Sequence, residues 1–224
     1  MIDSKIEETR INNKWPVARE GIPFFLIGAI VGSIFFITGL IIAGFIMTLL
    51  SLFILYFFRD PERTASIDEK TVLTPADGKV IEIQNIEDRE NPLGMPSIKI
   101  SIFMSLFNVH VNRIPIFGKI TKIEYNPGKF FSADLDKASE YNENNLITLL
   151  TDNGYKIVFI QIAGLIARRI VCWIKESNYV KSGQRFGLIR FGSRLDIYLP
   201  EDSRIMVKKL EKVKAGETIL GYLS

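Results

Sequence analysis

A glycine–serine pair, Gly192-Ser193, interrupts an otherwise strand-like segment near the C-terminus. Glycine weakens a regular strand, so the simplest interpretation of the pair is a β-bulge or a close backbone approach. The chemical alternative is a serine nucleophile beside a peptide carbonyl that only glycine leaves accessible. The pattern is not the Gly-x-Ser-x-Gly elbow of α/β-hydrolases, because Leu195 stands where the second glycine would be. On the chemical interpretation, Ser193 is the reactive residue.

The only imidazole, that of His110, lies in a segment where valines alternate with polar residues. This alternation predicts a strand whose other face carries His110 and Asn112. A single histidine is usually structural, but an imidazole titrates near neutrality and is therefore suited to proton transfer. Arg113 adds a fixed positive charge beside this candidate acid–base residue.

Asp77 lies in a turn, Asp77-Gly78, that leads into a strand-like segment. Asp-Gly is a common hairpin turn, which is the structural interpretation. The functional alternative is that Asp77 orients His110, so that Asp77, His110 and Ser193 have the roles of a catalytic triad. Their spacing in the sequence does not establish whether the three side chains meet.

Two adjacent arginines, Arg168-Arg169, are either a solvated basic pair or ligands for a phosphate, which arginine binds through two hydrogen bonds. With Arg113, they are the candidate substrate-binding residues. One cysteine and one histidine exclude zinc sites built from several cysteines or histidines, and no metal is expected. The net charge of +3 is too small and too mixed for a nucleic-acid-binding surface, so no nucleic-acid partner is expected.

The elements that position these residues begin with a long uncharged apolar run over residues 24–58. One membrane span needs ~20 apolar residues, so the run is too long for one span and just long enough for two. Basic residues flank it on both sides, Lys14 and Arg19 before it and Arg59 and Arg63 after it, which predicts a helical hairpin with cytoplasmic ends. A shallow re-entrant hairpin and a single tilted span remain alternatives. Residues 1–23 are then a cytoplasmic N-terminal segment.

Residues 59–224 have the composition of a folded domain and contain a series of short, largely β-branched segments. These segments predict strands over residues 80–83, 98–103, 120–123, 147–150, 156–160 and 195–199. Residues 166–176 fit a helix or a strand. The fold class is therefore mainly β (α+β), a compact antiparallel sandwich-like or barrel-like catalytic domain that follows the membrane hairpin.

Taken together, these segments resemble those of the short-form bacterial phosphatidylserine decarboxylases. The resemblance rests on six motifs in the family's order: Tyr56-Phe57-Phe58-Arg59-Asp60-Pro61, Pro75-Ala76-Asp77-Gly78, Phe107-Asn108-Val109-His110-Val111-Asn112-Arg113, Tyr125-Asn126-Pro127-Gly128-Lys129-Phe130, the segment 161–169, and Arg190-Phe191-Gly192-Ser193-Arg194. Each motif alone is modest, and their order makes the resemblance specific.

The resemblance implies a proenzyme that cleaves itself between Gly192 and Ser193 into a β chain, 1–192, and an α chain, 193–224, which stay together as a heterodimer. It implies that Ser193 becomes a covalent pyruvoyl group, which forms a Schiff base with phosphatidylserine and allows its decarboxylation to phosphatidylethanolamine. It further implies that Asp77 and His110 assist the self-cleavage and that His110 also takes part in the decarboxylation.

The resemblance also implies a site at the inner cell membrane, with the catalytic domain on the cytoplasmic side; it leaves the oligomeric state open. One departure concerns a second histidine. Longer members of the family have two histidines three residues apart, whereas this chain has His110 and Arg113. The role of the second histidine is therefore unassigned.

Two other classes of function fit parts of the sequence. A membrane-tethered, non-catalytic binding module with a lipoyl-like β domain would explain the repeated Val-Lys-x-Gly segments at 180–183 and 213–216. A serine hydrolase would use Ser193, His110 and Asp77 without cleaving its own chain. Both predict an intact chain, and only the hydrolase predicts labelling of Ser193 by a fluorophosphonate.

Overall fold

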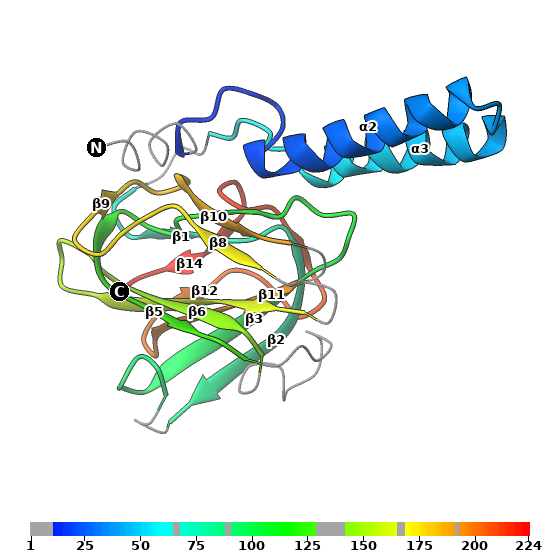
Figure 1. Cartoon of the computed structure of the whole chain (residues 1–224). Helices are drawn as coiled ribbons and strands as arrows, with labels where there is room; N and C mark the ends of the chain where they lie inside the picture. Colours follow the sequence, from blue (N-terminus) through cyan, green and yellow to red (C-terminus); the bar gives the residue numbers. More distant parts are fainter. Residues whose placement is uncertain (1–10, 65–67, 88–90, 129–141, 165–168, 191–192) are drawn as a thin grey trace. The chain divides into compact units, whose positions relative to one another are not determined.

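The computed structural model describes residues 11–64, 68–87, 91–128, 142–164, 169–190 and 193–224. The chain forms two compact units, one made of Asn12–Glu62 and the other containing Arg63–Ser224 (Figure 1). The first unit holds the helices, and the second holds all the strands of the described residues.

The helical unit is a hairpin of α2 (Ile22–Ile37) and α3 (Ile41–Phe57), preceded by the short 3₁₀ helix η1 (Arg19–Gly21). Gly39 reverses the chain between the helices with a φ of +78°, a conformation that glycine adopts without steric cost. Gly28 and Gly32 of α2 are buried against α3, and a Cβ atom at Gly28 would collide with the Ser51 hydroxyl. These small residues allow the two helix backbones to pack closely.

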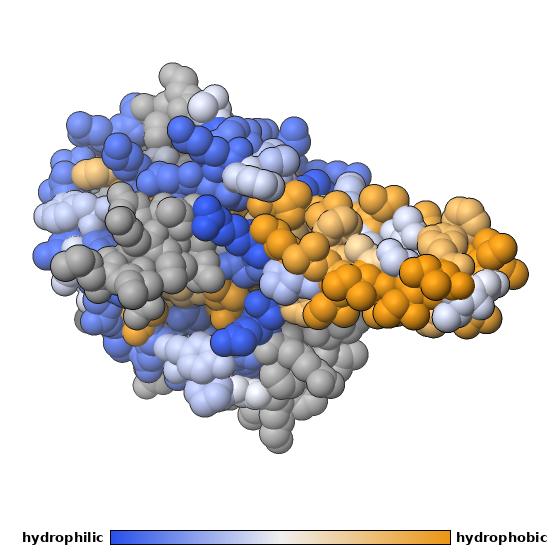
Figure 2. All heavy atoms as spheres, turned by 45° about the horizontal axis from the view of Figure 1, so that its top comes forward, coloured by the Kyte–Doolittle hydropathy of each residue, from blue (hydrophilic) through white to orange (hydrophobic). Residues whose placement is uncertain are grey.

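The outward-facing side chains of the hairpin are mostly large and apolar (Figure 2); Ile37, for example, is 85% exposed. By length and composition, the helix Arg19–Ile37 is able to cross a membrane, and Ile41–Phe57 is a shorter apolar helix. Large exposed apolar surfaces are rare on soluble monomers and usually mark contact with a partner or a lipid phase.

The β unit is built on a curled antiparallel sheet of eight strands. In order across the sheet these are β13 (Lys212–Val213), β2 (Gly78–Ile86), β3 (Ser97–Met104), β11 (Ser193–Pro200), β7 (Lys156–Ala163), β6 (Asn144–Leu150), β5 (Gly118–Asn126) and β9 (Tyr179–Val180). Two smaller sheets complete the unit. They are β1 (Thr71–Leu73), β14 (Ile219–Tyr222) and β12 (Arg204–Ile205), and β4 (Val111–Arg113), β10 (Arg185–Ile189) and β8 (Ile170–Cys172). The predicted mainly β, antiparallel fold is confirmed.

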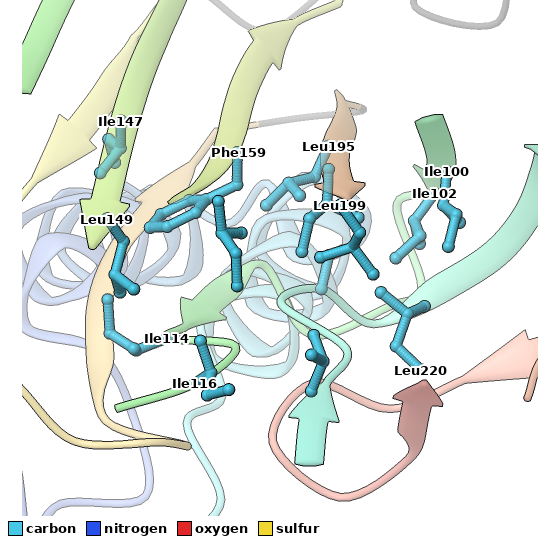
Figure 3. Close-up of a cluster of buried hydrophobic side chains, with 14 of the residues drawn as sticks. Ile100, Ile102, Ile114, Ile116, Ile147, Leu149, Phe159, Leu195, Leu199 and Leu220 are labelled. Atoms are coloured by element: carbon cyan, nitrogen blue, oxygen red, sulfur yellow. The ribbon is translucent and has the colours of Figure 1, made fainter. Parts of the chain in front are cut away.

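Strand β11 is central, paired along its whole length with β3 and along most of it with β7. Its alternate residues Leu195, Ile197 and Leu199 enter the main core, where they pack with side chains from β3, β6 and β7 (Figure 3). Burial of one such side chain contributes about 1.5–3 kcal/mol. The residues that alternate with them, Arg194, Asp196 and Tyr198, lie on the other face of the sheet, and they are buried as well. Both faces of β11 are therefore covered.

Two local expectations are refined by the structure. The ambiguous segment 166–176 contains a strand, β8, in its described part. The strand expected around His110 is shorter than predicted: it begins at Val111, so His110 precedes it. The reason is a turn at Ser105–Asn108, where the Asn108 side chain accepts hydrogen bonds from the backbone and hydroxyl of Ser105. Such local bonds compete with strand pairing.

Candidate active site

Ser193 is the first residue of β11 and lies between Met104 of β3 and Ala163 of β7. It is fully buried, and its Oγ donates to the Met104 sulfur at 3.8 Å. Sulfur is a weak acceptor, so this bond holds the hydroxyl only loosely. Gly192, the predicted partner in cleavage, lies outside the described residues. The predicted nucleophile is thus placed at the head of a rigid central strand.

His110 is 2% exposed and lies directly before β4. Its Nδ1 is 3.0 Å from the carbonyl oxygen of Asn108. A carbonyl only accepts, so Nδ1 carries the proton, and in the neutral ring Nε2 has the lone pair that a base needs. The His110 carbonyl also accepts a bond from the Ile189 amide at 3.4 Å, four residues before Ser193 in the sequence.

Asp77 is held by Arg63 rather than by an imidazole. Both terminal guanidinium nitrogens of Arg63 donate to its carboxylate, Nη2 at 2.9 Å from Oδ2, and the Ala215 amide donates to Oδ1 at 2.8 Å. The side chains of Arg63 and Asp77 are 5% and 10% exposed. Paired hydrogen bonds of this type combine charge and fixed geometry. Arg63 was predicted only as a basic flank of the apolar run, and its role as the partner of Asp77 was missed.

The three predicted catalytic residues lie at the starts of different strands or directly before them: Asp77 before β2, His110 before β4 and Ser193 at the first position of β11. Asp77 precedes β2, whose neighbour in the sheet is β3, and β3 in turn adjoins β11 and Ser193. Gly78 packs so tightly under the Phe103 carbonyl that a Cβ atom would collide with it. The contacts given above for Asp77, His110 and Ser193 are with other residues, so the joint action of the three side chains stays a prediction.

A depression of about 560 Å³ opens beside Asp77 and extends to Phe103 and Ser105, the residues on either side of Met104. Three lysines line it, Lys79, Lys212 and Lys214, together with Phe107, which is 67% exposed. Its wall thus combines positive charge with aromatic surface, and it lies one residue from the cross-strand partner of Ser193.

Three buried amides next to Ser193 were not predicted as site residues. Asn145 of β6 donates to Gln161 of β7 at 3.0 Å, and Gln161 donates to Asn112 of β4 at 2.9 Å. Asn112 in turn donates to the Met104 sulfur at 3.6 Å, the same atom that Ser193 contacts. Asn112 and Gln161 both occur in motifs of the family resemblance, which is the signal that could have found them.

The candidate phosphate ligands are separated by the fold. Arg113 is buried and its guanidinium donates to the Gly183 carbonyl at 2.8 Å. Arg169 is exposed, and Arg168 lies outside the described residues. A metal site is also absent from the described part of the chain, in which no three acidic, histidine or cysteine side chains gather.

Arg194 points to the sheet face opposite Ser193. Its Nε and Nη2 bind the two carboxylate oxygens of Asp196 at 2.6 and 3.0 Å, and Nη2 also donates to Ser101 at 3.0 Å. Glu82 lies 3.7 Å from the same Nη2 and accepts a bond from Lys99 at 3.0 Å. Partial burial raises the pKa of Glu82, but the bond and charge of Lys99 and the charge of Arg194 outweigh burial and lower the pKa overall.

A buried serine therefore begins the central strand of a mainly β fold and is the candidate catalytic residue. The comparisons with known proteins identify the class of protein. A family model described as phosphatidylserine decarboxylase matches residues 50–221. The chain belongs to the phosphatidylserine decarboxylase family and is a decarboxylase.

Several curated bacterial relatives are similar over most of their length. The phosphatidylserine decarboxylase proenzyme of Desulfotalea psychrophila is 52% identical over 93% of this chain and 97% of its own. That of Syntrophus aciditrophicus is 53% identical over 92% of this chain and 96% of its own. The proenzyme of Rickettsia akari is 53% identical over 79% of this chain and 76% of its own.

Proposed function

We propose that this chain is a proenzyme that cleaves itself between Gly192 and Ser193 and then decarboxylates phosphatidylserine to phosphatidylethanolamine. The names of the relatives support both the substrate and the proenzyme state. The observation that carries the proposal is Ser193 itself, fully buried at the first position of a strand that is paired on both sides. The hydroxyl of a serine placed in this way is enclosed by the protein and adjoins the peptide bond that precedes it.

Maturation begins when Ser193 Oγ attacks the carbonyl carbon of the preceding residue. The new C–O bond forms, the hydroxyl proton passes to the base His110, and the C–N bond then breaks with protonation of the amine, which leaves an ester. Loss of the Ser193 α-proton expels the ester as a new C-terminal carboxylate on residue 192. Water then replaces the dehydroalanine nitrogen, which releases ammonia and leaves a pyruvoyl group at residue 193.

The residues around Ser193 fit such a group, because Asn112 donates an amide N–H to the Met104 sulfur that Ser193 also contacts, and because burial limits contact with bulk water. The pyruvoyl group supplies an electrophilic carbonyl that binds the amine of the lipid and accepts the electrons left by the departing carboxylate. His110 is the residue that holds and moves the proton. The lysines of the depression beside Asp77 complement the negative charge of the lipid headgroup.

The two chains formed by cleavage are expected to stay together as a heterodimer. Ser193–Pro200 pairs with β3 and with β7, both of which belong to the 1–192 chain. The α chain also contributes β13 to the large sheet and β12 and β14 to a small sheet with β1. Separation of the two chains would remove the central strand β11 from the core and break its pairing with β3 and β7.

The apolar hairpin supports a location at the inner membrane, where the lipid substrate resides. We assign residues 1–23 to a cytoplasmic lead-in, 24–58 to the membrane hairpin and 59–224 to the catalytic domain on the cytoplasmic side. The short length of α3 is compatible with a tilted or shallow hairpin as well as with two full spans.

Intact-mass measurement of the purified protein under denaturing conditions tests the proposal. The expected result is two species that break between residues 192 and 193, the smaller one lighter by one ammonia than a peptide that starts with serine. Ser193→Ala should remain one chain without decarboxylase activity. A single intact wild-type chain that a fluorophosphonate labels at Ser193 would instead favour the serine hydrolase, and an intact unlabelled chain the binding module.

A further inference from the structure

The three buried amides beside Ser193 form a directed chain of hydrogen bonds. Each amide donates toward the next: Asn145 to Gln161, Gln161 to Asn112, and Asn112 to the Met104 sulfur. The Ser193 hydroxyl donates to the same sulfur. All five side chains belong to residues that are at most 2% exposed, so bulk water does not compete for these bonds.

The last link of this chain is much weaker than the others. The amide–amide bonds have ordinary lengths of 3.0 and 2.9 Å, whereas two donors, from Asn112 and Ser193, share a single thioether acceptor. A thioether is a weak acceptor, and buried donors are normally matched with strong ones. The Asn112 donor, which shares its acceptor with Ser193, is therefore poorly used in the resting proenzyme, and a negatively charged oxygen within its reach would be a far better partner.

Gln161 fixes the direction in which Asn112 donates. Its carbonyl oxygen accepts from Asn145, so its NH₂ group faces the Asn112 oxygen and turns the Asn112 NH₂ group toward the Met104 sulfur, which Ser193 also contacts. Gly187 of β10 leaves room for this arrangement, since a Cβ atom there would lie 3.2 Å from the Gln161 nitrogen and would collide with the Val171 carbonyl. The donor is thus oriented before any reaction, which is the condition for efficient electrostatic stabilisation.

We infer that Asn112 donates a hydrogen bond to the oxygen that becomes negative when Ser193 attacks, and that Gln161 and Asn145 are positioning residues for it. This inference rests on the proposed self-cleavage. In that step the Oγ–C bond forms, the hydroxyl proton leaves to the base, and the carbonyl π electrons move to the oxygen. Asn112 keeps its proton and stabilises the resulting charge.

The test compares the rate of self-cleavage of the full-length wild-type chain with that of Asn112→Asp and Asn112→Ala. Aspartate has nearly the same shape and still accepts from Gln161, but it lacks the NH₂ donor. Loss of one such donor typically lowers a rate about 10²–10³-fold, and both variants should show a loss of this size. Gln161→Leu should give a smaller loss, because Asn112 keeps its donor but not its orientation.

Asn142→Asp is the matched control. Asn142 is also a buried amide, and its Nδ2 donates to Ala163, the cross-strand partner of Ser193, at 2.8 Å, but it is outside the chain of amides. This variant should cleave within about threefold of the wild-type rate. Equal slowing of the Asn142 and Asn112 variants would overturn the inference, because it would mean that any disturbed amide near β7 slows cleavage.

Hydroxylamine, which cleaves esters, separates the attack of Ser193 from the later elimination. If Asn112 acts on the attack, the Asn112 variants form little ester, and hydroxylamine should not restore their cleavage. Cleavage by hydroxylamine at the wild-type rate would mean that the ester forms normally, and this too would overturn the inference. If the wild-type chain stays intact, the proposed function itself fails; if it cleaves and Asn112→Asp cleaves equally fast, only the inference fails.

Discussion

Arg63 and Asp77 form a buried ion pair in which both ends of the guanidinium fork bind the carboxylate. Arg63 also donates to the Ala215 carbonyl at 2.7 Å, and Ala215 returns a bond from its amide to Asp77 at 2.8 Å. Ala215 lies in the turn between β13 and β14, on the C-terminal side of the proposed cleavage point. The pair therefore ties the segment before β2 to the segment that the proposed cleavage would release as the α chain.

Removal of the arginine from this pair should strongly destabilise the fold. Arg63→Met leaves the Asp77 carboxylate buried without its cation, which costs about 3–5 kcal/mol. Urea unfolding on the uncleaved Ser193→Ala background, in detergent, measures this loss. Arg204→Met, at an exposed arginine of β12, is the control and should change the free energy of unfolding by less than about 0.5 kcal/mol. A similar small change for Arg63→Met would mean that the pair is dispensable.

His110→Ala should slow self-cleavage by about 10²–10⁴-fold, the usual contribution of a general base. The physical reason is that the ring, held through Nδ1 by the Asn108 carbonyl, no longer offers Nε2 to the Ser193 proton. The rate is measured from the loss of the full-length band with time, with and without added imidazole. Partial recovery with imidazole supports a role in proton transfer, and cleavage of the variant at the wild-type rate would refute it.

The strands and the helical hairpin were predictable because their signals are local. Alternation of apolar residues identifies a strand such as β11 and also places Arg194 on the face opposite Ser193. The uncharged run over residues 24–58 identifies the helices by length alone. In the His110 segment the alternation predicted a strand that is longer than β4 at its N-terminal end. The Asn108 side chain stabilises a turn there, so the strand begins only at Val111.

The polar contacts of the site were not predictable in the same way. Asn145, Gln161 and Asn112 come from three strands of two different sheets, and only the completed fold brings their amides into one chain. The Arg63–Asp77 pair joins residues that flank the undescribed segment 65–67, with no periodic pattern to relate them. Such contacts depend on register and topology, which a single sequence specifies only weakly.

The lysines of the depression beside Asp77 should affect binding of the lipid more than the chemical step. The double variant Lys212→Gln with Lys214→Gln removes two positive charges that attract an anionic headgroup, each exposed interaction being worth about 0.2–1 kcal/mol. Its KM for phosphatidylserine in neutral phosphatidylcholine vesicles should rise several-fold, with kcat nearly unchanged. Lys122→Gln, at an exposed lysine of β5, is the control. An unchanged KM in the double variant would exclude the depression as the headgroup site.

The contribution of Glu82 to stability should depend on pH in a defined direction. Its folded-state pKa lies below the ordinary value of 4.5, because Lys99 and Arg194 favour the charged carboxylate more than burial disfavours it. A carboxyl with a lowered folded pKa binds fewer protons in the folded state than in the unfolded state. Its stabilisation is therefore fully present above about pH 4.5 and is lost as the pH falls through the folded pKa.

Urea unfolding of Ser193→Ala with and without Glu82→Gln measures the contribution of this carboxylate to the free energy of unfolding. Glu82→Gln should be destabilising at pH 7, and the difference between the two chains should shrink below pH 4.5. A difference that stays constant from pH 7 to pH 3 would show that Glu82 acts through packing and not through its charge.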